Sequence, residues 1–64
     1  MVKINGLDVP ADNVCLQDYL TGQGFRTDRI AVELNGRIVP RATYSSVTLT
    51  PGDTVEIVQF VGGG

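Results

Sequence analysis

The stretch that decides the fold is Thr54-Val55-Glu56-Ile57-Val58-Gln59-Phe60-Val61-Gly62-Gly63-Gly64. Its first part is rich in β-branched and aromatic side chains, which is typical of a β-strand. Three glycines then end the sequence. Because glycine has no Cβ, such a segment orders poorly and can lie close to the atoms of a partner. The sequence therefore predicts a strand over residues 54–60 that leads into a flexible functional tail over residues 61–64.

The predicted strand is apolar on both faces near its end. One face carries Val55 and Ile57, and the opposite face carries Val58 and Phe60. The second face is either buried, as in a central strand covered on both sides, or exposed as an apolar patch beside the tail. Patches of that kind often mark a partner surface. Under the second interpretation Val58, Phe60 and Val61 are the candidate partner surface.

Two Asn-Gly pairs precede this strand, at Asn5-Gly6 and Asn35-Gly36. Each pair separates two short apolar stretches, and this is a strong signal of a tight β-hairpin. The sequence therefore predicts hairpins over residues 2–9 and 30–39. Val47 and Leu49 alternate with Thr48, in a short irregular piece that is expected between the second hairpin and the last strand.

One short amphipathic helix is predicted between the two hairpins. Leu16, Tyr19 and Leu20 have the spacing i, i+3, i+4 that places them on one helix face. Asp12 or Asn13 is expected to cap the start of this helix, and the glycines that follow it are natural C-cap residues. The order of elements predicts an α+β fold, with a mostly antiparallel sheet and one helix forming two layers.

Three further residues are assigned to packing. Phe25 is expected to pack under the end of the helix, and Tyr44, at the end of a predicted helical turn over residues 41–44, is expected to anchor the core. Cys15 is expected to be a small, partly buried thiol, since no base or cation is close to it in the sequence.

Composition narrows the function classes. The chain has 64 residues, which favours one domain, and a formal net charge of -2 with no basic cluster, which argues against a nucleic-acid partner. No apolar stretch is long enough for a bilayer, so no membrane partner is expected. There is no histidine and a single cysteine, so we expect no metal site and a reducing, cytoplasmic location.

No enzyme site is apparent in the sequence. It offers no nucleophile with a base, no acid–base pair and no phosphate-binding loop, so we assign no catalytic residue. The reactive group in an unusual setting is the terminal carboxylate of Gly64. Its reference pKa of about 3.3–3.7 means that it is ionised near neutral pH. An unhindered carboxylate can attack the α-phosphate of a nucleotide to form an acyl-adenylate.

The segments over residues 51–64 and 34–41, with Tyr44 soon after, carry a family resemblance. Two segments closely resemble the ThiS family, the sulfur-carrier proteins of thiamine biosynthesis. They are Pro-Gly-Asp-Thr-Val-Glu-Ile-Val-Gln-Phe-Val-Gly-Gly-Gly at residues 51–64 and Leu-Asn-Gly-Arg-Ile-Val-Pro-Arg at residues 34–41. The match spans nearly the whole chain. A diglycine end alone is less specific, because ubiquitin and the small subunit of molybdopterin synthase share it.

The resemblance implies a ubiquitin-like β-grasp fold, with residues 1–64 as a single domain. It implies a mixed sheet of about four to five strands packed on one short helix. The last strand is then central in the sheet and parallel to the first.

The resemblance also implies a function. A ThiF-like, E1-like adenylyltransferase would use ATP to adenylate Gly64, with Gly62 and Gly63 recognised as the tail. A sulfur donor such as a cysteine desulfurase would convert the adenylate to a thiocarboxylate, and a ThiG-like thiazole synthase would take its sulfur. The chain would be a protein co-substrate with no bound cofactor, and not an enzyme.

Three alternatives remain open at this point. The chain is a sulfur carrier for molybdopterin or another pathway, a modifier that is ligated to target proteins, or a noncovalent β-grasp interaction module with an idle tail.

Overall fold

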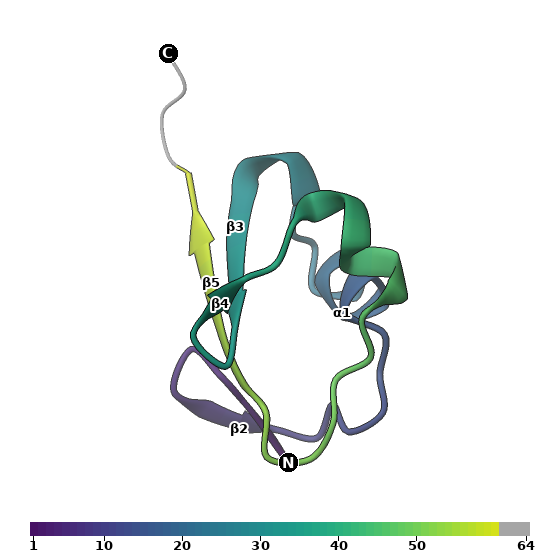
Figure 1. Cartoon of the computed structure of the whole chain (residues 1–64), viewed down its shortest axis with the longest axis vertical. Helices are drawn as coiled ribbons and strands as arrows, with labels where there is room; N and C mark the ends of the chain where they lie inside the picture. The colour runs from purple at the N-terminus through teal and green to yellow at the C-terminus, as the bar shows by residue number, and fades with distance from the viewer. Residues whose placement is uncertain (61–64) are drawn as a thin grey trace.

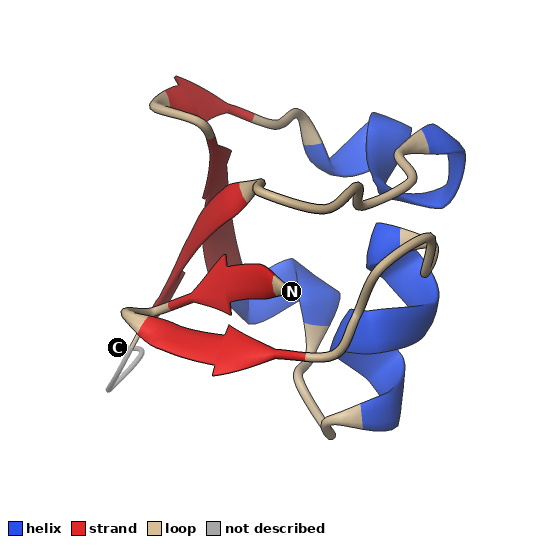
Figure 2. Ribbon diagram, turned by 90° about the horizontal axis from the view of Figure 1, so that it is seen from below, coloured by secondary structure: helices blue, strands red, loops and turns tan. Residues whose placement is uncertain are grey.

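The computed structural model describes residues 1–60, so the predicted flexible tail over residues 61–64 lies outside the described part of the chain. A sheet forms one layer, and a helix with two short 3-10 helices forms the other (Figure 2). In chain order the elements are β1 (Val2–Ile4), β2 (Leu7–Val9), α1 (Leu16–Gly22), η1 (Thr27–Arg29), β3 (Ile30–Leu34), β4 (Arg37–Ile38), η2 (Arg41–Ser46) and β5 (Thr54–Gln59).

The sheet has the strand order β2-β1-β5-β3-β4, which places β5 at its centre (Figure 1). β5 pairs parallel to β1 and antiparallel to β3, and the two hairpins β1–β2 and β3–β4 are antiparallel. This mixed sheet of five strands on one helix confirms the predicted α+β, β-grasp architecture. The last strand is central and parallel to the first, as the family resemblance implied.

Both hairpins form at the predicted Asn-Gly turns. Asn5 and Gly6 have φ angles of 49° and 83°, and Asn35 and Gly36 have φ angles of 51° and 83°. Two successive positive φ values match the twist of the flanking strands, which explains why Asn-Gly occupies both turns. The second hairpin is shorter than predicted, because β4 ends at Ile38.

The core lies between the sheet and the helical layer. Seven of its side chains are at most 2% exposed, and they come from strands, helices and a loop: Val2, Leu16, Leu20, Val32, Tyr44, Leu49 and Val55. Burying one such aliphatic side chain contributes about 1.5–3 kcal/mol. The predicted roles of Tyr44 as a core anchor and Phe25 as a packing residue are confirmed. Burial raises the pKa of the Tyr44 phenol, and the charge of Arg41 opposes that rise.

The predicted start of the helix is wrong. α1 begins at Leu16, and Cys15 takes the N-cap position without a side-chain cap hydrogen bond. Asn13 instead has a φ of 65° in the preceding turn, and Asp12 pairs with the α-ammonium group of Met1. An Asp-Asn pair favours turns as well as caps, and here the turn prevails.

The predicted end of the helix is confirmed at Gly24, whereas Gly22, the other expected cap, is the last residue of α1 itself. Gly24 has a φ of 84°, and its N–H donates to the Thr21 carbonyl at 3.0 Å. The Phe25 N–H donates to the Leu20 carbonyl, also at 3.0 Å. This pair of bonds is a Schellman motif, which needs a left-handed residue after the helix. No helix among residues 1–60 is long and apolar enough to cross a membrane.

Residues 47–49 form no strand of the sheet, in agreement with the short irregular piece expected there. This segment runs beside the loop before α1, with an isolated bridge between Cys15 and Thr48. Its backbone bonds go to that loop, as in the 2.8 Å bond from the Leu49 N–H to the Val14 carbonyl. The alternation of apolar side chains correctly indicated one buried side, since Leu49 is fully buried. It could not indicate that the partner is a loop rather than the sheet.

Candidate functional site

The candidate site is the end of β5 from which the chain continues into its glycines. β5 starts between two neighbours, with Thr54 and Val55 aligned with Lys3 and Ile4 of β1. Pairing with β3 continues to Gln59, and the Phe60 N–H still donates to the Arg29 carbonyl at 2.8 Å. β5 thus extends past the β1–β2 hairpin toward the C-terminus (Figure 1).

The side chain of Asn5 fixes β5 where β1 ends. Its Nδ2 donates to the Ile57 carbonyl at 3.2 Å, and its Oδ1 accepts the Ile57 N–H at 2.7 Å. The Asn5 backbone N–H also donates to the Val55 carbonyl at 2.9 Å. A turn residue therefore prolongs the β1–β5 pairing by one step, because its amide presents the same donor and acceptor as a peptide group.

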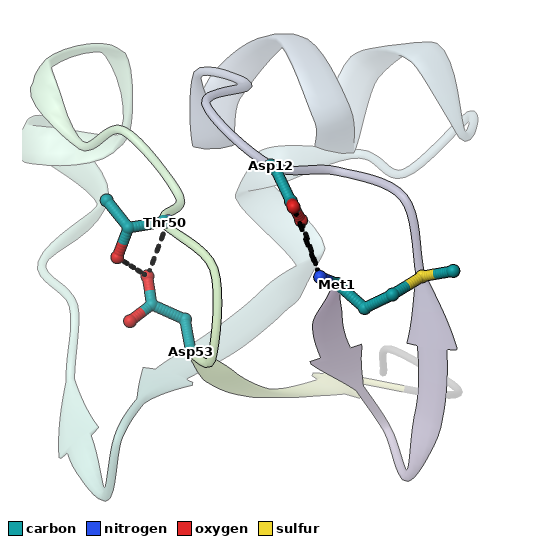
Figure 3. A network of polar contacts seen from close by, with 4 residues as sticks. All are labelled: Met1, Asp12, Thr50 and Asp53. Carbon is teal, nitrogen blue, oxygen red and sulfur yellow. Dashed lines mark hydrogen bonds and ion pairs between the residues drawn. The ribbon is translucent and has the colours of Figure 1, made fainter.

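The other end of β5 is fixed by Asn35, the asparagine of the second hairpin. Its Oδ1 accepts the Thr54 N–H at 2.9 Å, and its Nδ2 donates to Asp53 Oδ1 at 3.0 Å. Asp53 Oδ2 accepts bonds from the Thr50 N–H at 2.8 Å and from Thr50 Oγ1 at 3.0 Å (Figure 3). These bonds stabilise the charged carboxylate and lower its pKa, with the Thr50 backbone bond as the largest cause and the partial burial of Asp53 opposing it.

A second polar contact lies close to the turn over residues 50–53. The α-ammonium group of Met1 is 3.1 Å from the Asp12 carboxylate (Figure 3). The Met1 carbonyl accepts the Gly52 N–H at 3.0 Å. The ion pair is solvent-exposed, so its contribution to stability is at most about 1 kcal/mol.

The face of the sheet away from α1 is open. We call this the open face; its described members, placed by strand register and alternation, are Lys3, Asp8, Ala31, Glu33, Ile38, Thr54, Glu56, Val58 and Phe60. Val58 is 57% exposed and Phe60 is 59% exposed. The interpretation of β5 as a strand buried on both faces is therefore wrong, and the predicted exposed apolar patch beside the exit is present.

The open face also brings two like charges together. Glu33 and Glu56 are directly opposite each other on β3 and β5. Neither makes an ion pair within residues 1–60. Like charges at directly opposed positions destabilise a sheet, so this pair does not serve the stability of the free chain.

The other candidate reactive groups do not lie at the C-terminal end of β5. Cys15 is half-buried, as predicted, and its Sγ lies 3.6 Å from the Ser45 carbonyl in the helical layer. Among residues 1–60, no three side chains of His, Cys, Asp or Glu lie together in a group that could hold a metal ion. The candidate residues Val61, Gly62, Gly63 and Gly64 lie outside the described part.

Sequence reasoning missed the contribution of Asn5 and Asn35 to this site. Each was assigned only to a turn, and its contact with β5 depends on pairing between remote segments, since Asn5 and Ile57 are 52 positions apart. It also missed Ala31 and Ile38 as members of the open face. A register for β3 against β5 would have placed them there, but local sequence contains no signal for that register.

The geometry defines a class of protein. A β-grasp sheet whose central strand is followed, after Phe60 and Val61, by three glycines is the arrangement of a ubiquitin-like protein with a glycine end. The family model for the ThiS family matches residues 1–64. The chain belongs to the ThiS family, a family of small sulfur carrier proteins and not of catalysts.

Individual relatives agree with this assignment. The chain is 38% identical to sulfur carrier protein ThiS of Bacillus subtilis, over the full length of both. The crystal structure of the thiamine biosynthesis protein ThiS from Geobacter metallireducens superposes with a TM-score of 0.76 at 28% identity, covering 98% of this chain and 97% of that one.

A different kind of relative is a much longer protein. A thiazole synthase of Magnetococcus marinus is 45% identical over 98% of this chain, but the match covers only 20% of that protein. The chain thus spans about a fifth of the length of this relative. That thiazole synthase contains, within its own polypeptide, a segment similar to 98% of this chain.

Proposed function

We propose that this chain carries sulfur as a thiocarboxylate on Gly64 and supplies it to a thiazole synthase in thiamine biosynthesis. The observation that carries the proposal is the central strand β5, anchored on both sides and continuing into three glycines, in a chain of the ThiS family. The sheet holds the rest of the chain together, and a carboxylate is available at the end of a segment without side chains.

The chemistry requires activation before sulfur can be accepted. A carboxylate oxygen of Gly64 attacks the α-phosphate of ATP in a ThiF-like, E1-like partner, and pyrophosphate leaves. The outer sulfur of a persulfide on a donor such as a cysteine desulfurase then attacks the acyl carbon and displaces AMP, which forms an acyl disulfide. A thiol cleaves this acyl disulfide, releasing the thiocarboxylate and forming a disulfide with the donor cysteine. The chain itself binds no cofactor in this scheme, because the ATP is bound and used by the adenylating partner.

We propose thiazole synthase as the recipient of the sulfur because of the similarity to the longer thiazole synthase of Magnetococcus marinus. A thiazole synthase that contains a segment like this chain keeps carrier and synthase together by a covalent tether, which raises their effective concentration. The present chain would reach a ThiG-like synthase as a separate protein. We place this exchange in the cytoplasm, in keeping with the single cysteine of the chain.

Partner contact is proposed for the apolar part of the open face beside the exit. Val58 and Phe60 are large apolar side chains, and both are more than half exposed. Together with Val61, they would dock on the adenylating partner, while Gly62 and Gly63 pass through a channel too narrow for side chains.

The test is ATP–pyrophosphate exchange catalysed by the cognate adenylating enzyme. The parent chain should support exchange, a C-terminal amide at Gly64 should abolish it, and Gly64→Val should remove most of it while the circular dichroism spectrum stays unchanged. Exchange at the parent rate with the amide would contradict the proposal. Mass spectrometry after addition of the sulfur donor should show sulfur in place of one terminal oxygen, and labelled sulfur should enter the thiazole rather than molybdopterin.

A further inference from the structure

β5 changes from a central strand to an edge strand at Ile57. Its even-numbered residues bond to the β3 side, as in the 2.8 Å bonds that link Thr54 to Asn35 and Phe60 to Arg29. Its odd-numbered residues bond to the β1 side, where Asn5 holds the backbone of Ile57. By this alternation, the N–H and C=O of Gln59 point to the side where β1 has already ended.

The backbone groups of Gln59 have no hydrogen-bond partner on that side within residues 1–60. Figure 1 shows the same arrangement, with β3 along one side of the upper part of β5 and no strand along the other. A row of unpaired N–H and C=O groups at the edge of a sheet is a template for another strand. We call this the free edge of β5.

We propose that the free edge of β5 at Gln59 accepts an extended backbone segment of the adenylating partner. This inference rests on the proposed function and adds a mode of recognition to it. A neighbouring donor and acceptor on one strand match an extended peptide, which adds to a sheet edge through main-chain hydrogen bonds. The adenylating partner is the occupant because the free edge lies five residues before Gly64, the group on which that enzyme acts.

Two features of the structure fit this occupant. Val58 and Phe60 project from the open face on either side of Gln59 in the sequence, so one partner can contact their side chains and pair with the backbone between them. Asn5 uses both backbone groups of Ile57. An added strand therefore cannot pair with β5 residues on the N-terminal side of Gln59, so Asn5 sets the register of the added strand.

Pairing at this position would also serve the reaction. A strand held on one side only can pivot, whereas pairing on both sides fixes the direction in which the chain leaves the sheet. Attack on a phosphate is sensitive to misplacement of the reacting group by about 1 Å. The partner's strand would thus aim the carboxylate of Gly64 as well as bind the chain.

Amide hydrogen exchange tests the proposal without any substitution. In the free chain, the Gln59 amide should exchange faster than the amides of Val58 and Phe60, which bond to β3. Adding the adenylating enzyme should slow exchange at Gln59 at least tenfold. An unchanged Gln59 rate in a chain that is demonstrably bound overturns the proposal. Protection of Gln59 that rises with the concentration of the chain alone would assign the edge to a second copy and also overturn it.

A matched pair of variants provides the second test. Gln59→Pro removes the N–H that points to the free edge and leaves the bonds to β3 in place, whereas Gln59→Ala keeps the N–H and removes the side chain. The proline variant should raise the KM for the chain in pyrophosphate exchange about tenfold, equivalent to about 1.4 kcal/mol, and the alanine variant should stay within about twofold. Equal effects of the two variants would refute backbone recognition.

The two tests separate this inference from the proposed function. If the parent chain supports no ATP–pyrophosphate exchange with the adenylating enzyme, the proposed function fails, and the inference fails with it. If the parent supports pyrophosphate exchange but the Gln59 amide gains no protection from hydrogen exchange, only the inference fails. Circular dichroism of Gln59→Pro shows whether its fold is intact. If that variant does not fold, amide hydrogen exchange of the parent chain alone decides whether the free edge of β5 is paired in the complex.

Discussion

Replacing Asn5 by glycine should weaken the hold on β5 while keeping the turn. Glycine adopts the φ of 49° found at Asn5 without strain, so the hairpin itself should survive. The variant loses the two hydrogen bonds, of 3.2 Å and 2.7 Å, between the Asn5 side chain and Ile57. At about 0.5–1.5 kcal/mol net for each bond, the free energy of unfolding should fall by about 1–3 kcal/mol.

The control for this prediction is Asn13→Gly. Asn13 also has a positive φ, of 65°, and its side chain makes no hydrogen bond with any other group of residues 1–60. The backbone contribution of the substitution is therefore similar at both sites, and the difference between the two variants isolates the Asn5–Ile57 bonds.

Urea denaturation followed by circular dichroism is the appropriate assay. A loss of about 2 kcal/mol should also lower the Tm by about 8–16 °C in a domain of this size. If Asn5→Gly and Asn13→Gly change stability equally, the Asn5 side chain does not hold β5 and the reasoning is wrong. Asn5→Asp should also lose stability, because it can still accept the Ile57 N–H but sets its second carboxylate oxygen against the Ile57 carbonyl in place of a donor.

Three further predictions concern charge and the open face. Glu56→Gln should raise the free energy of unfolding by about 0.2–1 kcal/mol, because it removes the repulsion from Glu33. Asp18→Asn makes the same charge change on the helix and should not raise the free energy of unfolding. Equal changes in the two variants would refute the repulsion between Glu33 and Glu56. Asp53 has a folded-state pKa below its usual value, so its contribution should be present above its unfolded pKa of about 3.9 and be lost as pH falls through the lower folded pKa. Asp53→Asn should therefore flatten the acid side of a plot of Tm against pH, and an unchanged slope would contradict this. Val58→Asp should leave the circular dichroism spectrum unchanged and raise the KM in pyrophosphate exchange, whereas unfolding of this variant would show that Val58 belongs to the core.

Local chemistry explains why much of the fold could be predicted. Asn-Gly turns need positive φ at both positions, so Asn5-Gly6 and Asn35-Gly36 marked both hairpins. The glycines after the apolar stripe marked the end of α1, where Gly24 takes a left-handed conformation. In each of these cases the physical cause lies within a few residues of the feature that it predicts.

The features that could not be predicted depend on contacts between remote segments. The bond between Asn5 and Ile57 joins residues 52 positions apart, and nothing near either residue indicates it. The alternation at residues 47–49 indicated burial but not which segment would pair with it. Exposure of Val58 depends on the lack of a layer over the open face among residues 1–60, and a strand's own sequence does not determine that.

The parallel pairing of β1 with β5 has a consequence for how the chain folds. The two strands lie at opposite ends of the sequence, so the centre of the sheet forms only after nearly the whole chain is brought together. Contacts of such high sequence separation slow folding. During synthesis, a ribosome-bound chain that lacks residues 54–59 has β1 but no neighbour for its inner edge. The folded sheet is therefore assembled only once the strand leading to the glycines has been made, which couples completion of the fold to the presence of the proposed thiocarboxylate end.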